Sequence, residues 1–544
     1  MKIFLIITVI LNLFIVPQIC AQKAQPNLLL ILTDGVRRSE FGCYGATNGL
    51  TKNIDTLASR GVRFTEAYSA APVALSSRMA LLTGQHPVRF RVADSSRNGL
   101  LSKSYRLREE PELGTYIKDA PSLFKILTKA GYDCADFAEL SPQAGVKKSQ
   151  NLSSQGERVV NFLKKTHKKP WCIAVSLEDP SPWKIDAEVG KITSTLETLG
   201  LSSQTIVVLT STHGAPYPAE LLQTASTSYQ PLNGQEGYLH EGGLRVPLII
   251  AWAKHRSGGL VTSEATVTMD IFATLVEAAG VNAPSDLISK SDGLSLFPAM
   301  QVNGKLPRDF LCWHLPHYGR FGGEPASAIR MGNLKLIQFY ECPREEFFDL
   351  SKDIGERRNI ADSRKEDLVT LRNRLEAWKQ ALGITKIEPN PNYSATASAD
   401  KSGIIVLSGS QAQVHGTLIR YEPQPHKNTV GYWANGKDWV SWQFIIAKPG
   451  RYEIELLQGC GTGGEGSDMS LSIGNETLRF VVQQTGHFQN FVSRKLGQLR
   501  INETGLQTLA LRAETKRGGA VMDVRQIRLI PVGLSSSSLV NPHP

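Results

Sequence analysis

The sequence predicts an α/β domain with a mainly parallel central sheet flanked by helices, then a small α+β subdomain, then an all-β sandwich domain. Up to about residue 304, short apolar runs that end in a polar residue alternate with helix-like stretches, which is typical of a parallel sheet buried on both faces. After about residue 402, apolar and polar residues alternate singly, which indicates strands with one buried face. A chain of 544 residues also exceeds what one hydrophobic core organises, so at least two domains are expected.

The first residues predict a secretory signal peptide over 1–21. Lys2 precedes an apolar run from Ile3 to Val16, and Ala21 offers a small residue at a cleavage point. This run is shorter than the ~20 residues that a membrane-spanning helix needs, and no later segment is apolar enough to span a bilayer. We therefore expect a secreted or periplasmic protein with no transmembrane segment, and an N-terminal membrane anchor is the alternative.

The composition restricts the classes of partner. The formal net charge is +10, and it falls to +9 when Lys2 is removed with the signal. The basic residues are scattered and no nucleic-acid motif is present, so the excess charge either serves solubility or favours a glycan or sulfated polysaccharide. The cysteines after the signal have no paired spacing, so disulfides and buried free thiols both stay open. The sequence gives no indication of the oligomeric state.

The α/β domain is expected to span residues 25–304. Its helices include a stretch from Ser122 to Lys129. Its buried strands are expected at Asn27–Thr33, Trp171–Leu177 and Thr205–Thr210. Open α/β sheets bind ligands at the carboxyl ends of their strands, and Asp34 and His213 both follow such ends.

A smaller α+β subdomain is expected over 305–385. Leu334–Phe339 has the pattern of a strand, and Lys365–Leu382 has the pattern of an amphipathic helix. Proline and asparagine then mark a linker over 386–401.

Residues 402–531 are expected to form the sandwich, followed by a tail over 532–544. Apolar residues alternate in its strands, and Pro449-Gly450 marks a turn between two of them. The clearest alternations are at Val440, Trp442, Phe444 and Ile446, and at Tyr452, Ile454 and Leu456. The segment is about 130 residues long, enough for a core of its own, so we expect it to fold independently.

Several stretches resemble signature segments of the sulfatase family, which belongs to the alkaline-phosphatase-like superfamily. Two of them, Asn53–Ala58 and Gly61–Tyr68, are similar to the residues that precede the active-site motif. Others are similar to the end of that motif, to a metal-binding strand end and to later signatures: Ser77-Arg78 with Leu81–Gly84, Thr210–Gly214, Glu241–Pro247, and Asp353–Glu356 with Asn359. The resemblance covers residues 25 to about 385.

This resemblance implies an arylsulfatase-like hydrolase of sulfuric esters. In the family, a cysteine or serine is converted to formylglycine, whose hydrated form attacks the sulfur atom. A calcium ion held by carboxylates and by an amide or imidazole polarises the sulfate. Lysines and histidines bind the anion and assist departure of the leaving group.

The chain departs from that pattern at the nucleophile and at the metal site. Ala74 occupies the formylglycine position, and a methyl group cannot be oxidised to an aldehyde. Asp34-Gly35 stands where the family has two aspartates, and Thr212-His213 where an aspartate precedes the last ligand. We therefore expect no catalytic residue and no formylglycine. A residual, incomplete metal site at Asp34 and His213 would hold Ca²⁺ weakly or not at all.

The anion-binding positions are altered as well. The residual candidates for binding a substrate anion are Arg78 and Lys335. The positions of the family's lysines and histidines align here with Glu139, Ser141, Glu236, Glu178 and Ser181. A lysine about 4 Å from an anion attracts it by ~4 kcal/mol at an effective dielectric of 20, and a glutamate reverses that sign.

Each surviving residue also has a structural interpretation. Asp34 would cap nearby amides, Arg78 would form a buried ion pair, and His213 would be a core histidine. His314 and His317 have a spacing that suits a metal, but Pro316 between them favours packing.

Two classes of function follow, and we favour the first. The chain is either a catalytically inactive sulfatase-family protein (a pseudoenzyme) that binds glycans or sulfated polysaccharide, or an active sulfuric ester or phosphate-ester hydrolase of altered mechanism. In the second case Ser76 or Ser77 would be the nucleophile, although neither occupies the nucleophile position.

The predicted sandwich resembles carbohydrate-binding modules of secreted glycan enzymes. Tyr432, Trp433 and Trp439 lie in a turn-rich segment and are the candidate carbohydrate-binding residues, because aromatic faces stack on sugars. Trp442 lies inside an alternating strand and is expected in the core.

Overall fold

The structure is a computed structural model of the chain. It describes residues 25–90, 107, 122–138, 140, 154–214, 232–253, 258–281, 291–317, 325–341, 344–390, 396–400, 402–422 and 427–532. The predicted signal peptide, Glu139, Ser141 and all but the first residue of the predicted tail lie outside these residues. Within them, no helix combines the length and the apolar character that crossing a bilayer requires.

A seven-stranded sheet in the order β4-β5-β1-β6-β7-β2-β8 organises the first domain. The central strand β1 pairs in parallel with β5 and β6, and only β7 runs antiparallel to its neighbours. The strands are β1 Asn27–Leu32, β2 Val62–Phe64, β4 Asp133–Phe137, β5 Trp171–Ser176, β6 Thr205–Thr210, β7 Leu248–Trp252 and β8 Leu260–Thr262. The predicted mainly parallel sheet is confirmed.

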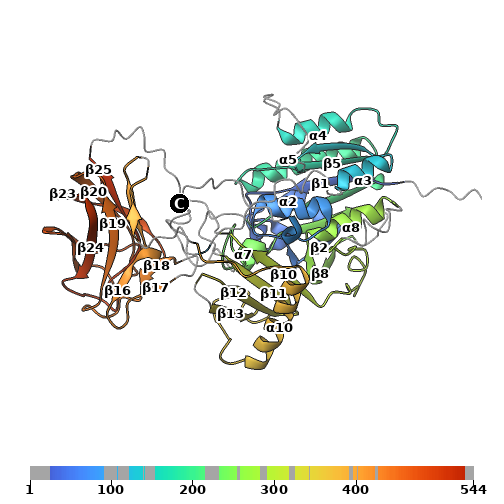
Figure 1. Cartoon of the computed structure of the whole chain (residues 1–544). Helices are drawn as coiled ribbons and strands as arrows, with labels where there is room; N and C mark the ends of the chain where they lie inside the picture. Colours follow the sequence, from blue (N-terminus) through green and yellow to red (C-terminus); the bar gives the residue numbers. More distant parts are fainter. Residues whose placement is uncertain are drawn as a thin grey trace, which may run out of the picture.

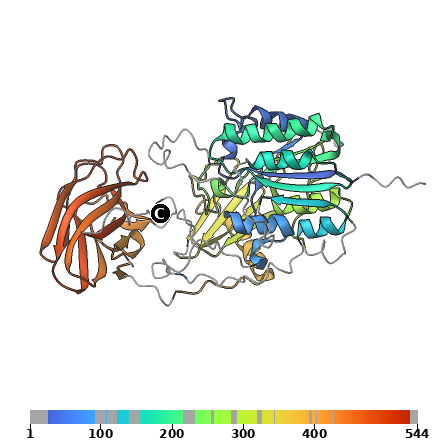
Figure 2. The same ribbon diagram turned by 90° about the horizontal axis from the view of Figure 1, so that it is seen from above.

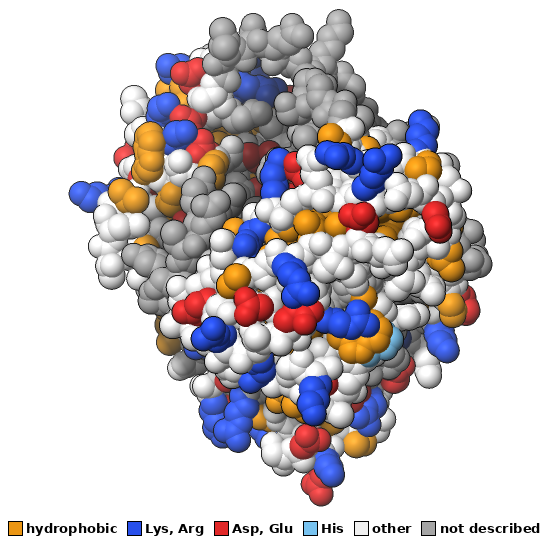
Figure 3. All heavy atoms as spheres, turned by 90° about the vertical axis from the view of Figure 1, so that its left-hand side faces the viewer, with side chains coloured by type: hydrophobic (Ala, Val, Ile, Leu, Met, Phe, Trp, Pro, Cys, Tyr) orange, Lys and Arg blue, Asp and Glu red, His pale blue; other side chains and the backbone are white. Residues whose placement is uncertain are grey.

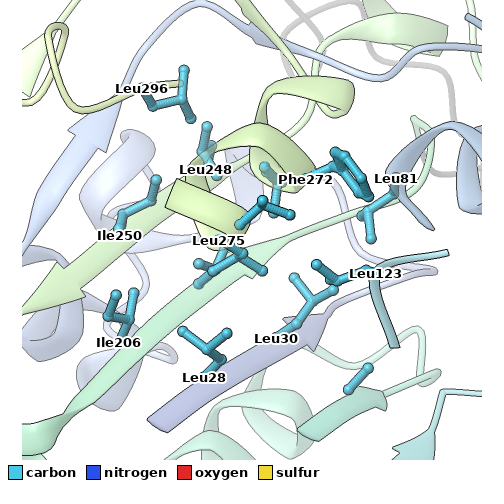
Figure 4. Packing of buried hydrophobic residues seen from close by; sticks show 14 of the residues in the cluster. Leu28, Leu30, Leu81, Leu123, Ile206, Leu248, Ile250, Phe272, Leu275 and Leu296 are labelled. Atoms are coloured by element: carbon cyan, nitrogen blue, oxygen red, sulfur yellow. The ribbon is translucent and has the colours of Figure 1, made fainter. Parts of the chain in front are cut away.

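Helices cover both faces of this sheet (Figures 1 and 2). Leu28 and Leu30 of β1 pack with α2, α3 and α8, whereas Leu29 and Ile31 pack with α1, α4 and α5. The helices are α1 Lys52–Arg60, α2 Ala74–Thr83, α3 Leu123–Lys129, α4 Gln155–Leu163, α5 Pro182–Thr198 and α8 Met269–Ala278. Figure 4 shows the first of these layers, in which Leu275 of α8 lies above Leu28 and Leu30 of β1. Alternate residues of a doubly buried strand must both be apolar, as the sequence predicted.

The α+β subdomain is an antiparallel sheet in the order β10-β11-β12-β13. One face packs on helix α10, and the other packs on the first domain through residues such as Tyr68 and Leu244. The elements are β10 Phe310–Leu315, β11 Ala326–Met331, β12 Leu334–Phe339, β13 Arg344–Asp349 and α10 Lys365–Ala381. Two short strands, β3 Ala67–Tyr68 and β9 Thr266–Val267, and the short helix α7 Glu241–Leu244 lie in the first domain.

The last domain is a sandwich of two six-stranded sheets (Figure 1). One contains β14, β16, β19, β21, β22 and β24, and the other β15, β17, β18, β20, β23 and β25. The first sheet has the strands Ala397–Ser398, Gln413–His415, Trp439–Ile446, Asp468–Ile473, Glu476–Val481 and Gly505–Ala513. The second has Ile405–Ser408, Arg420–Glu422, Thr429–Gly431, Gly450–Gly459, Val492–Ile501 and Asp523–Pro531.

The sandwich has a hydrophobic core of its own. Its buried residues run from Ala397 to Leu529, and Trp442 is among them, as predicted. Strand β14 starts at Ala397, inside the predicted linker, so the sandwich begins before the expected residue 402. The two residues of β14 pair with β19, which is why they belong to the sandwich despite a composition typical of a linker.

Candidate active site

The candidate site lies at the carboxyl ends of β1 and β6, which are neighbours in the sheet. Asp34 follows β1, and Thr212 and His213 follow β6. Because the two strands run parallel and in register, the residues after their ends meet at one edge. The structure thus brings Asp34 and Thr212 into contact, at the position where α/β folds place their ligand sites.

Asp34 is buried, with 6% of its surface exposed, and both of its carboxylate oxygens have partners. Oδ1 accepts hydrogen bonds from the backbone N–H of Thr212 at 2.8 Å and from its hydroxyl at 3.0 Å. Oδ2 accepts from Nη2 of Arg78 at 3.2 Å. The carboxylate therefore binds a guanidinium of the same chain.

Arg78, in the second turn of α2, bridges two carboxylates. The same Nη2 donates a hydrogen bond of 2.8 Å to Oε1 of Glu178, which is the second residue after β5. Burial lowers the pKa of the Arg78 guanidinium, but the charges and hydrogen bonds of Asp34 and Glu178 raise it more, so the net shift is upward. A guanidinium held by two carboxylates attracts a third anion weakly.

Ala74 is the first residue of α2, one helical turn before Arg78. Residues four apart lie on the same side of a helix, so the methyl group of Ala74 lies on the Arg78 side. Ser77 is fully buried, and its Oγ has no hydrogen-bond partner within the part of the chain that the structure describes. Ser76 is also buried, and it lines a different cavity together with His314.

The residues at this edge do not fit a calcium ion. Calcium takes 6–8 oxygen ligands in proteins. Asp34 already binds Thr212 and Arg78, Gly35 has no side chain, and Nδ1 of His213 lies 2.8 Å from the carbonyl oxygen of Gly214. Among the described ranges, no group of three or more His, Cys, Asp and Glu residues is placed to hold a metal.

Lys335, predicted as a residual substrate-binding residue, is 0% exposed. Its Nζ forms ion pairs with Glu241 at 2.9 Å and with Glu356 at 2.8 Å. Burial raises the pKa of Glu241, but Lys335 and Arg245 lower it more, to about 2. This corrects the prediction. The Lys335 ammonium is paired within a buried ion cluster that joins β12 to helix α7, and a substrate cannot reach it.

The aromatic residues predicted to bind carbohydrate differ from one another. Trp433 is 0% exposed and donates its indole N–H to the carbonyl of Asp438 at 2.9 Å, so its prediction as a sugar platform is wrong. The turn-rich sequence around Trp433 gave no sign that the chain folds back over it. Tyr432 is 51% exposed, with the Arg420 guanidinium over its ring at 4.0 Å.

Trp439 has both ring faces covered. His415 and Arg512 are its cross-strand partners on the strands to either side, β16 and β24. The His415 ring stacks on it at 3.7 Å, and the Arg512 guanidinium lies 3.8 Å from the ring centre. This corrects the prediction of Trp439 as a free stacking face. On the side of the molecule in Figure 3, basic and acidic side chains are interspersed and hydrophobic ones are scattered.

Two features of this edge escaped the sequence analysis. Trp183, at the start of α5, is 54% exposed and follows the loop whose Asp179 backbone packs against Gly35. Beside His213 lies a cavity of about 430 Å³ whose lining includes Arg37, Arg38 and Arg245. The signal for this cavity was the Arg37-Arg38 doublet, which begins three residues after Asp34.

Two family models match the chain. The sulfatase model matches residues 26–177 and 183–281, with a break at the residues that follow β5. The model described as N-sulphoglucosamine sulphohydrolase, C-terminal, matches residues 235–381. Together the two models span the first domain and the α+β subdomain.

Curated relatives and solved structures agree with the models. Arylsulfatase A of Bos taurus is 25% identical over 439 residues, which cover 63% of this chain and 85% of that protein. N-acetylgalactosamine-6-sulfatase of Rattus norvegicus is 26% identical over 355 residues, 51% of this chain and 66% of that protein.

The solved structures have the same fold. A protein solved with its substrate D-glucosamine-2-N,6-O-disulfate aligns with a TM-score of 0.52 and 18% identity, over 68% of this chain and 99% of that one. A sulfatase from Pseudoalteromonas sp. aligns with a TM-score of 0.51 and 19% identity, over 68% and 93%. Through residues 26–381, this chain is similar to the sulfatase family.

Proposed function

We propose that this protein is a secreted sulfatase-family member without sulfatase activity, and that it binds glycans or sulfated polysaccharide. The observation that carries the proposal is the pairing of Asp34 with Arg78 beside Ala74. A working site of the family needs a nucleophile, a cation and free positive charge. Here a methyl group stands at the nucleophile position, and a guanidinium occupies the carboxylate that would bind the cation.

A role in binding is supported by an exposed aromatic side chain near this edge of the sheet. Trp183 leaves 54% of its surface exposed in the residues after β5, and aromatic faces bind the apolar faces of sugar rings. The Lys184 ammonium lies 5.6 Å from the same indole ring. That ammonium also pairs with Asp179 at 3.2 Å, so the exposed indole, and not a free cation, is the feature that suits a sugar. Tyr432 of the sandwich is a second exposed ring, on a different domain.

The relatives support sulfated sugars as the ligand class. Their names include N-acetylgalactosamine-6-sulfatase, and one solved structure holds D-glucosamine-2-N,6-O-disulfate as its substrate. A member of such a family can lose catalysis and still bind sugar, because recognition of the sugar and attack on the sulfur depend on different residues.

Turnover is tested with the purified mature chain, aryl sulfates and glycan sulfates in the presence of added calcium. We expect no sulfate release, and mass spectrometry should find unmodified alanine at position 74. Ala74→Cys and Ala74→Ser should not restore activity, because Asp34 stays bound to Arg78. Calcium-dependent release of sulfate that disappears in Asp34→Ala would refute the proposal.

Binding is tested on a glycan array with the full chain and three variants. Trp183→Ala should weaken binding of sulfated glycans at the sheet edge, and Tyr432→Ala tests the sandwich. Leu199→Ala is the matched control, because Leu199 is an exposed apolar residue at the other end of α5. Absence of glycan binding by the unmodified chain would contradict the proposed role.

One observation favours a second candidate, an ester hydrolase that uses Ser76. Ser76 and His314 line one cavity of about 580 Å³, and Nδ1 of His314 contacts the Ser327 hydroxyl at 2.7 Å. Burial lowers the pKa of His314 to about 3, so its imidazole is neutral but weakly basic at pH 7. A slow phosphate-ester or sulfate-ester turnover that Ser76→Ala abolishes and Ser77→Ala does not would establish this alternative.

A further inference from the structure

The cavity beside His213 has a positively charged lining. It encloses about 430 Å³, part of it open to solvent, and three guanidinium groups line it, from Arg37, Arg38 and Arg245. Among the described residues, Ser39 and His213 are its other polar lining side chains, and no aspartate or glutamate lines it. Arg37 and Arg38 are half-buried and Arg245 is buried, so the lining concentrates positive charge at one place.

Arg38 is the group with the least compensation. It starts the short 3-10 helix Arg38–Glu40, and its guanidinium lies over the Tyr44 ring at 4.6 Å. Within the described residues it has no ion pair, and its Nε is buried without a hydrogen-bond partner. Burial and the nearby charge of Arg245 lower the pKa of Arg38 to about 10, so it remains a cation at neutral pH.

Arg245 lines the same cavity, but its guanidinium is already bound by other residues. Its Nη1 lies 3.2 Å from Oε2 of Glu241, and its Nη2 donates to the carbonyl of Thr65 at 2.8 Å. The Glu241 carboxylate is shared with Lys335. Lys335 also pairs with Glu356, and Arg245 also lies 3.8 Å from Glu66, whereas Arg38 forms no ion pair with any described residue.

The cavity is separate from the degenerate site. It shares His213 with the positions of the family's metal site, but Asp34, Ala74 and Arg78 do not line it. The two places also differ in charge balance, since Arg78 has two carboxylate partners and Arg38 has none in the described part of the chain.

We propose that this cavity binds the oxyanion of a sulfate or phosphate ester, with Arg38 as its main contact. The planar fork of a guanidinium donates two parallel hydrogen bonds to such a group, and Arg245 and Arg37 add positive charge around it. For the identity of the natural ligand, this inference rests on the proposed binding of sulfated glycans.

The test is calorimetric titration of the mature full-length chain with sodium sulfate, with sodium phosphate, and with glucosamine 6-sulfate, 6-phosphate and unmodified glucosamine. Ionic strength is held constant with sodium chloride, so that general salt effects cancel. The sulfate and phosphate arms identify the source of the oxyanion, and unmodified glucosamine shows what the sugar adds.

Three variants decide the outcome. Arg38→Gln removes the charge, and Ser39→Trp fills the cavity without removing a cation; each should weaken oxyanion binding at least tenfold. Arg63→Gln is the matched control, because the Arg63 guanidinium lies over the same Tyr44 ring at 5.4 Å but does not line the cavity. It should leave the affinity within twofold. Melting curves verify that each variant is folded.

The cavity proposal is overturned if the unmodified chain binds neither oxyanion, if Arg38→Gln and Ser39→Trp bind normally, or if Arg63→Gln loses as much affinity as Arg38→Gln. Its failure is distinct from failure of the proposed function. Sulfated glycans that bind equally to Arg38→Gln and Ser39→Trp would refute the cavity alone. Inorganic sulfate that binds through Arg38, with no sulfated glycan bound, would refute the glycan function alone.

Discussion

Buried carboxylates are balanced in opposite ways in the two large domains. In the α/β domain, Glu241 lies against Lys335 and Arg245, and opposite charges hold its pKa at about 2. In the sandwich, burial and the like charge of Glu422 raise the pKa of Asp523 to about 7. Both Asp523 and Glu422 are almost fully buried.

The difference separates a permanent structural cluster from a group that titrates near neutrality. Glu241 keeps its charge at every physiological pH, so its cluster acts as a fixed link between α7 and β12. Asp523 changes charge in the physiological range, because burial and the charge of Glu422 raise its pKa more than Lys427, which pairs with Glu422 at 2.9 Å, lowers it. The two domains should therefore respond differently to charge substitutions and to pH.

The largest effect is expected from Lys335→Met. Removing this ammonium leaves Glu241 and Glu356 buried next to each other, and breaking a fully buried ion pair costs about 3–5 kcal/mol. Urea unfolding should show a loss of that size in the transition of the α/β domain and none in that of the sandwich. Lys191→Met, which removes an exposed partner of Glu188, should cost less than about 1 kcal/mol. Equal losses in both variants would contradict the role of burial.

Trp433→Ala should have a comparable effect in the other domain. Truncating a fully buried tryptophan costs about 3–5 kcal/mol, and here it also leaves the carbonyl of Asp438 without its indole donor. Trp439→Ala is the control, because that ring lies on the outer face between His415 and Arg512, and its loss should cost about 1 kcal/mol. Circular dichroism and urea unfolding measure both. A Trp433→Ala protein with an unchanged sandwich transition would show that its burial contributes little.

The raised pKa of Asp523 predicts that the stability of the sandwich, and not that of the α/β domain, depends on pH. Its folded pKa of about 7 lies above the ordinary value of 3.8, so between these values the folded state holds a proton that the unfolded state has released. The free energy of unfolding should therefore fall as the pH rises from about 4 to 7, by at most about 4 kcal/mol, and stay low above that.

Asp523→Asn should remove this slope, and Glu422→Gln should reduce it by removing the neighbouring charge. Asp468→Asn, on β21 of the same sandwich, should leave the slope unchanged. Denaturant unfolding at closely spaced pH values decides the matter. A sandwich whose stability rises between pH 4 and 7 in the unmodified protein would contradict the sign.

The smallest effect is expected from Arg78→Met at the candidate site. Asp34 would lose one partner but keep both hydrogen bonds from Thr212, so we expect a loss of about 1–2 kcal/mol. Arg60→Met removes an exposed partner of Glu197 and should cost less than about 1 kcal/mol. Thermal unfolding resolves the difference. If the two losses are the same, the Asp34–Arg78 pair is no stronger than a surface pair.

The sequence alone determined the architecture, and it placed Ala74 where the resemblance to the sulfatase family expects the nucleophile. Apolar runs such as Trp171–Leu177 are too short for a helix and indicate a strand buried on both faces. The alternation from Val440 to Ile446 fixes which residues of β19 face the core. Ala74 could be identified because a side chain's chemistry is a property of the residue itself.

The partners of charged and aromatic side chains were decided by the tertiary structure. Lys335 and Arg38 are both cations, yet one meets two carboxylates from α7 and from the loop after β13, and the other faces a cavity. Trp433 and Tyr432 are adjacent, and only the fold placed one ring in the core and the other at the surface. Such partners come from segments far apart in the chain. The free energy of a charge or a ring depends on which groups surround it, and no local pattern encodes that.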